Sequence, residues 1–289
     1  MKQLCVLGSL HLDVIVNANN LPQIDETVVG SEVNYVFGGK GGNQALAAEG
    51  HGANVYFIGR VGNDSFGESL LTTLRDSSID ISQVKQEAGA SGMSVAIINQ
   101  QGDYGAVIVS ESNLRIDKTD VTISENTGIL LLQNEIPEEI NLSASAKAMK
   151  EGSQVWSNAA PARKISKELL NNLDVVIINR PEALYYGDLF ISDESNHIIK
   201  IFTLGSEGLE VHFPNNKQEY HAAYSIDVQS THGAGDMFVG ALAANYLKNN
   251  NFSDALKYAQ AAAAIKVSKN AADRTSVQET DVSKFLRNS

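Results

Sequence analysis

The sequence contains few cysteines and few basic residues, on which disulfide-bonded, thiolate-metal and nucleic-acid-binding proteins depend. It has one cysteine in 289 residues, Cys5, so it lacks the partner for a disulfide, a C-x-x-C redox pair or a thiolate metal cluster. Its 22 basic residues are outnumbered by 34 acidic ones, and the formal net charge is -12 at pH 7. This charge repels the phosphate backbone of nucleic acid and the anionic surface of a membrane, so we expect neither as a partner.

Long apolar runs are also missing. No stretch approaches the roughly 18 consecutive apolar residues that cross a bilayer, and His11 and Asp13 interrupt the N-terminal apolar run before it could act as a signal sequence. These absences predict a cytoplasmic protein. With 43% hydrophobic residues the chain can still bury one large core, so we predict a single domain over residues 1–289.

Short apolar runs alternate along the chain with segments of helical pattern. The runs are typical of strands buried on both faces, and they cover residues 4–7, 55–58, 129–132, 154–156, 175–178 and 201–204. The helical patterns cover residues 43–50, 65–74, 140–151 and 166–173. This alternation predicts an α/β fold with a mostly parallel central sheet and helices on both sides.

Two segments, about 13–36 and 93–109, interrupt the alternation. Each shows strand-like alternation and turn residues with no helix between, so we predict that they pair as a small β-sheet beside the main domain. After Gly233 the pattern changes again, because residues 237–247 and 255–267 predict long, apolar and mostly buried helices.

The most informative motif is Gly233-Ala234-Gly235-Asp236, which directly precedes the first of these helices. The free N–H groups and positive dipole end of a helix start can hold the charge of a phosphoryl group. A carboxylate there can accept a proton from a hydroxyl, although an aspartate at a helix start is more commonly an N-cap. The motif alone therefore leaves both roles open for Asp236.

A second motif, residues 37–44, places four glycines around Lys40 before a predicted helix. It is not a Walker A loop, which needs a Ser or Thr after Gly-Lys and a glycine where this chain has Asn34. It is not a dinucleotide fingerprint either, because Gln44 occupies the position of the last glycine. Lys40 and Asn43 offer donors to hydroxyl groups, while a flexible surface turn is the alternative for this stretch taken by itself.

Together the two motifs resemble the signatures of the ribokinase, or PfkB, family of sugar kinases. The family's other landmarks follow in the same order almost from end to end, at residues 8–13, 133–135, 158–162, 179–182 and 203–208. The resemblance implies a three-layer, Rossmann-like domain with a small β-lid. It also implies an ATP-dependent carbohydrate kinase in which Asp236 is the catalytic base.

The resemblance extends to individual positions. It implies that Gly233, Ala234 and Gly235 act beside Asp236, and that the sugar is held by His11, Asp13, Gly39, Lys40, Asn43 and Glu135. The implied nucleotide-binding residues are Asn179, Thr203, Gly205, Ser206, Gly208 and Gln260, with a solvated helix position as the alternative for Gln260. Asn179 and Glu182 match an N-x-x-E signature that orders Mg2+ through water, in keeping with the reluctance of magnesium to lose its hydration shell.

Departures from the family pattern also carry predictions. Ser230 replaces an acid that helps to hold an activating K+, and the loop 269–274 lacks its usual glycine, so weak or absent K+ activation is expected. Arg274 in that loop offers a fixed positive charge as a substitute. His11 replaces an asparagine that contacts the sugar in ribokinases, which leaves the accepted hydroxyl pattern open. A direct acid–base role for His232 is the less favoured interpretation.

The expected reaction is phosphoryl transfer from ATP to a primary hydroxyl of a pentose, with D-ribose as the leading candidate. The alternatives are a sibling kinase for a ketohexose, sugar acid or nucleoside, and a non-catalytic sugar-binding member. The missing acid at Ser230 favours the non-catalytic alternative, and the retained Asp236, Lys40, Asn43 and Glu182 oppose it. A homodimer through the lid is expected, because an exposed strand edge and an apolar face are often covered by a second copy.

Overall fold

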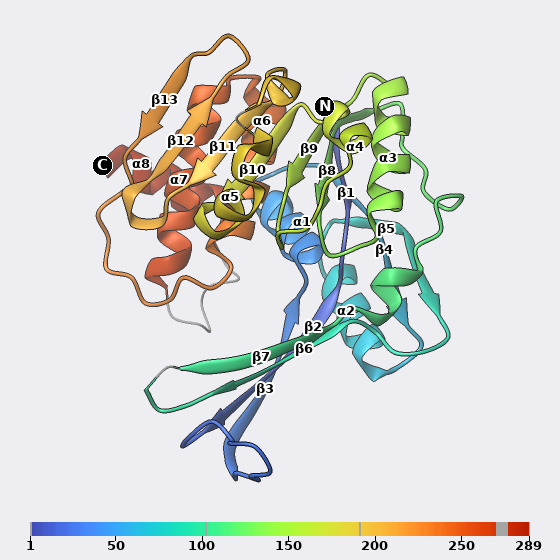
Figure 1. The fold of residues 1–289 in the computed structure, drawn as a ribbon, viewed down its shortest axis with the longest axis vertical. Coiled ribbons are helices and arrows are strands. Elements are labelled where there is room, and N and C mark those ends of the chain that lie inside the picture. The colour runs from blue at the N-terminus through green and yellow to red at the C-terminus, as the bar shows by residue number, and fades with distance from the viewer. Residues whose placement is uncertain (1, 102, 191, 270–276, 289) are drawn as a thin grey trace.

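A large sheet lies between two layers of helices, and a smaller sheet stands beside it (Figure 1). The computed structural model describes residues 2–101, 103–190, 192–269 and 277–288. The large sheet has the order β13-β12-β11-β10-β9-β8-β1-β4-β5. Its strands are β1 (Gln3–Leu7), β4 (Val55–Gly62), β5 (Asp80–Glu87), β8 (Thr127–Gln133), β9 (Gln154–Asn158), β10 (Val175–Asn179), β11 (Ile199–Thr203), β12 (Leu209–His212) and β13 (Gln218–His221).

Neighbouring strands of this sheet are parallel from β5 to β11, and the pairs β11-β12 and β12-β13 are antiparallel. The predicted α/β fold with a mostly parallel sheet is therefore confirmed. One face packs against α1 (Lys40–Gly50), α2 (Ser65–Arg75), α6 (Ala234–Asn249), α7 (Phe252–Ser268) and α8 (Glu279–Asn288). The other packs against α3 (Glu138–Lys150), α4 (Lys167–Asn171) and α5 (Arg180–Tyr186).

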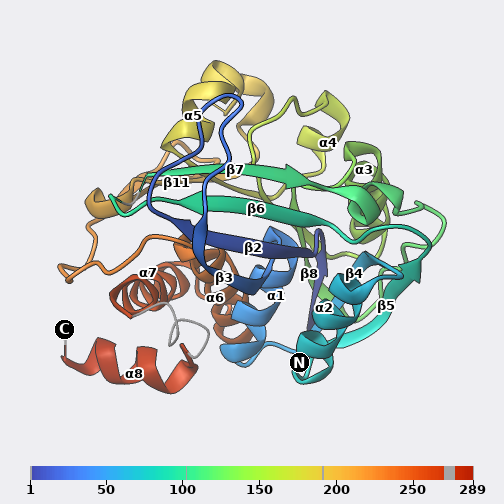
Figure 2. The same ribbon diagram turned by 90° about the horizontal axis from the view of Figure 1, so that it is seen from below.

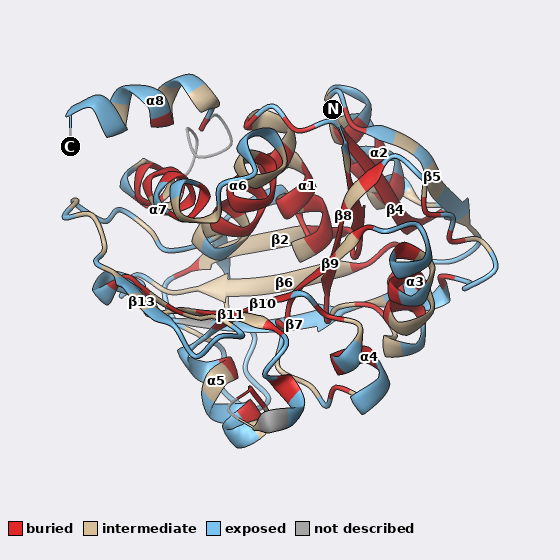
Figure 3. Cartoon of the chain, turned by 90° about the horizontal axis from the view of Figure 1, so that it is seen from above, coloured by how far each residue is buried: buried red, intermediate tan, exposed pale blue. Residues whose placement is uncertain are grey.

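The central strand β1 shows why the apolar runs are continuous. Leu4 and Val6 belong to the core beneath α1 and α6, whereas Cys5 and Leu7 belong to the core beneath α3. Successive side chains of a strand point to opposite faces, so a strand covered on both sides needs apolar residues at every position. In Figure 3 the strands β4, β8 and β9 are mostly red, which marks buried residues. Within the described ranges, no helix is long and apolar enough to cross a membrane.

The two segments that interrupt the alternation form the small sheet, as predicted. Its order is β3-β2-β6-β7, with strands β2 (His11–Ala18), β3 (Gly30–Gly38), β6 (Met93–Ile98) and β7 (Tyr104–Val109). Because β2 follows β1 after three residues, this sheet stands at the edge where the parallel strands end (Figures 1 and 2). We call it the lid.

One face of the lid is apolar and partly exposed. Directly paired residues of neighbouring strands point to the same side, so the register places a single set of side chains on this face. We define the apolar lid face by Val14, Val16, Val33, Tyr35, Val95, Ile97, Val107 and Val109. Tyr35 is 61% exposed and Val107 is 56% exposed.

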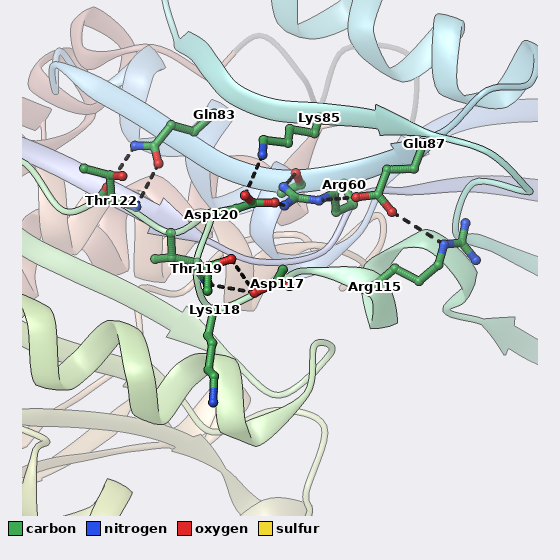
Figure 4. Close-up of polar contacts among 12 residues, drawn as sticks. Arg60, Gln83, Lys85, Glu87, Arg115, Asp117, Lys118, Thr119, Asp120 and Thr122 are labelled. Atoms are coloured by element: carbon green, nitrogen blue, oxygen red, sulfur yellow. Dashed lines mark hydrogen bonds and ion pairs between the residues drawn. The ribbon is translucent and has the colours of Figure 1, made fainter.

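An ion-pair network around the buried Arg60 joins the base of the lid to the main domain (Figure 4). Arg60 of β4 is 1% exposed, and it donates to Glu87 at 2.8 Å and to Asp120 at 2.7 Å. Asp120 also pairs with Lys85 at 2.7 Å. Arg115, in the 3₁₀ helix η1 (Glu111–Arg115) that follows β7, lies 3.8 Å from Glu87. Since a buried charge is costly without a partner, the two carboxylates compensate the burial of the Arg60 guanidinium.

Some element boundaries differ from the sequence prediction. The helices α1 and α6 begin at Lys40 and Ala234, several residues before their apolar patterns start, because glycine-rich segments form their first turns. The segment 166–173 contains only the five-residue helix α4. The strands β5, β12 and β13 were not predicted. β5 and β13 form the two edges of the sheet and β12 lies next to β13, and all three contain several polar residues. The remaining 3₁₀ helices are η2 (Gly187–Phe190), η3 (Asp193–Ser195) and η4 (Gly205–Glu207).

Candidate active site

Most residues singled out by the sequence lie where neighbouring strands of the large sheet end. Asn179 and Thr203 end β10 and β11, Glu135 lies two residues beyond β8, and His11 and Asp13 begin the lid strand that follows β1. In open α/β sheets, ligands bind in the crevice outside the carboxyl ends of the strands. The topology therefore brings together residues far apart in the chain at one edge of the sheet.

The glycine-rich segment 37–44 leads from the end of β3 into the first turn of α1 and packs closely against the turn after β1. A Cβ atom at Gly41 would lie 2.7 Å from the backbone nitrogen of Ser9, and Gly42 N donates to Ser9 O at 3.0 Å. A side chain at position 41 is thus excluded by backbone. This close approach holds Lys40 and Asn43 at the edge of the sheet.

Asp236 lies in the first turn of α6 and faces α1. The helix is capped by the backbone of Gly233, which has a left-handed conformation with φ of 73°, so Asp236 is not the N-cap. Gln44 Nε2 donates to Asp236 Oδ1 at 2.9 Å, and Asn43 Nδ2 lies 3.5 Å from Oδ2. Burial raises the pKa of Asp236, the charge of Lys40 and the Gln44 hydrogen bond oppose the rise, and the charge of Glu135 adds to it.

A cavity of about 180 Å³ lies against this carboxylate. It joins the start of α6 to the start of α1 and to the ends of β9, β10 and β11, and its polar lining comes from Lys40, Asn158, Asn179, Glu182, Thr203 and Asp236, with Gly233 and Gly235. Seven of these residues were predicted site residues. One cavity thus presents an amine, a carboxylate and the amides of a glycine-rich helix start.

A second group of polar side chains lies beside Lys40, beneath the lid. Glu135 Oε2 accepts hydrogen bonds from Lys40 N at 2.8 Å and from Ser9 Oγ. His11 Nδ1 lies 3.9 Å from the same oxygen, while His11 Nε2 is buried without a hydrogen-bond partner. Asp13 accepts from Ser94 Oγ of β6, and burial raises the pKa of Asp13. These groups offer both donors and acceptors to a polyhydroxylated ligand.

Asn179 and Glu182 form a capping box at the start of α5. Asn179 Oδ1 accepts from Glu182 N at 3.0 Å, and Glu182 Oε2 accepts from Asn179 N at 2.7 Å. The N-x-x-E spacing therefore has a structural reason besides any role in metal binding. Among the described residues, no group of three His, Cys, Asp or Glu side chains gathers into a metal site. Mg2+ bound to nucleotide phosphates needs only one or two protein carboxylates, so Glu182 on the cavity wall fits such an ion.

Other predicted residues lie outside this cavity. Gly205, Ser206 and Gly208 form the turn η4 and its C-cap after β11. Gln260 Nε2 donates to the backbone oxygens of His221 at 3.2 Å and Ala222 at 3.3 Å, so contact of Gln260 with adenine stays a prediction.

Two sequence predictions concern His232 and the loop 269–274. His232 is exposed. Residues 270–274, including Arg274, lie outside the described part of the chain, so weak K+ activation also stays a prediction.

Sequence reasoning missed two polar residues of the site, Gln44 and Asn158. Gln44 was considered only as the residue that rules out a dinucleotide fingerprint, yet it contacts Asp236 directly. Asn158 begins a family landmark but was assigned no role, and its side chain lines the cavity. Both are buried amides. A polar residue inside an apolar segment needs a buried hydrogen-bond partner, and this pattern could have indicated Gln44 and Asn158 as site residues.

Comparison with known proteins agrees with this geometry. Residues 1–279 match the model of the pfkB family carbohydrate kinases. The ribokinase of Lactococcus lactis is 33% identical over 280 residues, which cover 93% of this chain and 92% of that protein. The ribokinase of Haemophilus influenzae is 30% identical, over 99% of this chain and 98% of that protein. The solved structure of Arabidopsis thaliana ribokinase complexed with ribose and ATP has a TM-score of 0.92 and 26% identity, and the match covers 100% of this chain and 99% of that one.

Proposed function

The chain belongs to the pfkB family of carbohydrate kinases and is an ATP-dependent sugar kinase, and from this premise we propose that it phosphorylates a primary hydroxyl of a pentose, first of all D-ribose. The observation that carries the mechanism is the position of Asp236. Its carboxylate lies among the amides of a helix start and on the wall of the cavity that also contains Lys40. The ribokinase relatives, and ribose in the Arabidopsis structure, support D-ribose as the first candidate.

In the proposed reaction, Asp236 accepts the proton of the acceptor hydroxyl as its oxygen attacks the γ-phosphorus of ATP. The bond between the γ-phosphorus and the β,γ-bridging oxygen breaks, and ADP leaves with that oxygen. The first-turn amides of α6 and the ammonium of Lys40 stabilise the negative charge on the transferring group. Positioning the two substrates in line contributes most of the remaining rate enhancement.

We propose that Mg2+ enters with the nucleotide. When bound, it neutralises charge on the phosphate oxygens during transfer. Glu182 and Asn179 would contact its water shell, because the capping box fixes both side chains at the cavity wall. The turn at 205–208 and the end of β11 would border the nucleotide, with Gln260 nearby on α7.

The sugar would lie between α1 and the lid. Asp13, Asn43, Glu135 and Lys40 would bind its hydroxyl groups, and the backbone at Gly39 allows close approach. Paired polar contacts of this kind reject a ligand that lacks the right hydroxyl strongly. A sibling kinase for another sugar remains the second candidate, and one observation favours it: the unpartnered Nε2 of His11 beside Glu135 offers a contact that asparagine does not.

The test of the catalytic role is Asp236→Asn in a coupled ADP-release assay with Mg-ATP and ribose. Loss of a general base lowers turnover by about 10²- to 10⁴-fold, while the KM for the sugar should change little. Asp254→Asn is the matched control, because Asp254 is exposed in the first turn of α7 and lies outside the cavity. Near-normal turnover of Asp236→Asn would refute the assignment.

The same assay tests the substrate. We expect the highest kcat/KM for ribose in a panel with deoxyribose, fructose, ketodeoxygluconate and nucleosides. Preference for another compound would favour the sibling kinase. Binding of a sugar without turnover of any compound in the panel would favour the non-catalytic alternative.

A further inference from the structure

Gln44 joins the proposed catalytic carboxylate to a chain of buried amides. It has no exposed surface, and each polar group of its side chain has a partner. Gln44 Nε2 donates to Asp236 Oδ1 at 2.9 Å and to Asn158 Oδ1 at 3.0 Å. Gln44 Oε1 accepts from Gln133 Nε2 at 2.8 Å.

The neighbouring groups determine which way this amide points. Asn158 Nδ2 donates to the backbone oxygen of Ile177 at 3.2 Å, so the Asn158 oxygen faces Gln44. A reversed Gln44 amide would place its oxygen against two acceptors, Asn158 Oδ1 and Asp236 Oδ1. Gln133 Oε1 is buried without a hydrogen-bond partner, but both polar groups of the Gln44 side chain are paired. Reversing the Gln44 amide would leave these groups unpaired, so Gln44 is held in one orientation.

The consequence for Asp236 is an unequal pair of carboxylate oxygens. Oδ1 accepts a hydrogen bond of ordinary length, 2.9 Å, from Gln44. Among the described residues, Oδ2 has only the long 3.5 Å contact with Asn43. We propose that Gln44 is a positioning residue that holds Oδ1 and leaves Oδ2 free to receive the proton of the acceptor hydroxyl. This inference rests on the proposed role of Asp236 as the base.

Gln44 should also keep the base ionised. Burial favours the neutral form of Asp236, and an N–H donor to Oδ1 favours the charged form. The other charged groups near Asp236 are Lys40 at the start of α1, Glu135 after β8, Glu182 at the start of α5 and Lys266 of α7, which approaches Gly233. All four stay in place in the variants below, so a shift can be assigned to position 44.

Two substitutions separate the donor from the shape of the side chain. Gln44→Met keeps the length and removes the donor, so the acid limb of the kcat–pH profile should move up by about one pH unit. Turnover at its optimum should fall about ten- to a hundredfold as the carboxylate loses its orientation. Gln44→Glu places a second carboxyl group beside Asp236, and because the two would share a proton, the acid limb should move further up.

The experiment combines single-turnover pH profiles with ¹³C NMR of aspartate carboxyl groups in the full-length protein. The Asp236 resonance is assigned by its absence in Asp236→Asn. Asn141→Leu is the control, since Asn141 is a buried amide that donates to the backbone oxygen of Gln133 at 2.8 Å and is not bonded to Asp236. Its thermal unfolding measures the cost of losing a buried amide.

The expected result is that both the carboxyl resonance and the acid limb titrate at higher pH in Gln44→Met, higher again in Gln44→Glu, and unchanged in Asn141→Leu. If Gln44→Met loses activity and stability while the resonance and acid limb keep their wild-type positions, Gln44 is merely structural and the inference is overturned. Failure of the proposed function is distinguishable, because Asp236→Asn would then retain turnover whatever the Gln44 variants do.

Discussion

The spacing of α1 and α6 offers a direct test of how closely the site depends on packing. The two helices cross at Gly240, where a Cβ atom would lie 2.6 Å from Ala47 Cβ and from Gln44 O, and 2.8 Å from Ala48 N. The first two distances are about 0.8 Å short of the 3.4 Å at which ordinary contact begins. Since two of the three neighbours are backbone atoms of α1, Gly240→Ala must push the helices apart.

The effect on stability should be modest. Overpacking in a close-packed core costs about 1 to 3 kcal/mol, and replacing glycine by alanine within a helix returns about 1 kcal/mol. We therefore expect a net loss of about 1 kcal/mol in the free energy of unfolding. The effect on turnover should be larger, because α6 carries Asp236 and α1 carries its partners Asn43 and Gln44. A displacement near 1 Å at a reacting group can cost about a hundredfold in rate, so kcat should fall about ten- to a hundredfold.

The coupled ADP-release assay and thermal unfolding measure the two effects on the same samples. Gly50→Ala is the control, because a Cβ atom at the end of α1 would lie 3.4 Å from its nearest neighbour, the side chain of Gln278. This variant should keep wild-type turnover. Wild-type turnover in Gly240→Ala would refute the reasoning, since it would mean that the distance between α1 and α6 does not control the carboxylate.

Two further predictions concern acid stability and assembly. His51 is buried against Tyr258 and Met237, and burial lowers its pKa to about 4, below the unfolded value of 6.5. As the pH is lowered, the unfolded chain therefore binds the proton first, and the free energy of unfolding should fall by about 1.4 kcal/mol per pH unit between pH 6.5 and 4. The Tm of His51→Gln should depend less on pH over this range. The apolar lid face predicts a homodimer in sedimentation velocity, which Val107→Glu should convert to monomer; a monomeric wild-type protein would contradict this.

The central sheet was predictable because burial on both faces leaves a strong pattern. Strands β1, β4, β8, β9, β10 and β11 each contain an apolar run that the sequence analysis placed. The edge strand β5 contains polar residues on both faces and pairs with β4 alone, so its composition resembles a loop. An edge strand is defined by its pairing with one strand that lies far away in the chain, and local sequence patterns do not predict such pairing.

The same distinction applies to the site. Asp236 and the glycine-rich segment were identified because their motifs are local and resemble a known family. Gln44 was missed because its role depends on Asp236, 192 residues away, and on Asn158, 114 residues away. The capping box of Asn179 and Glu182 could have been predicted from the sequence, since its spacing is a local signature of a helix start.

Substrate preference is harder to predict than reaction type for a physical reason. Phosphoryl transfer needs a base, a helix start and cations in one cavity, and each of these has a recognisable residue type. Discrimination between sugars depends instead on single hydrogen bonds whose direction is set by side-chain orientation. The group that we propose to be decisive here is His11, the first residue of lid strand β2, whose Nδ1 lies 3.9 Å from Glu135 Oε2 and whose Nε2 is buried without a hydrogen-bond partner. The orientation of that nitrogen is a property of the folded site. The histidine at position 11 therefore leaves the accepted hydroxyl pattern open in the sequence, and it does not identify the sugar whose hydroxyl groups would match the site.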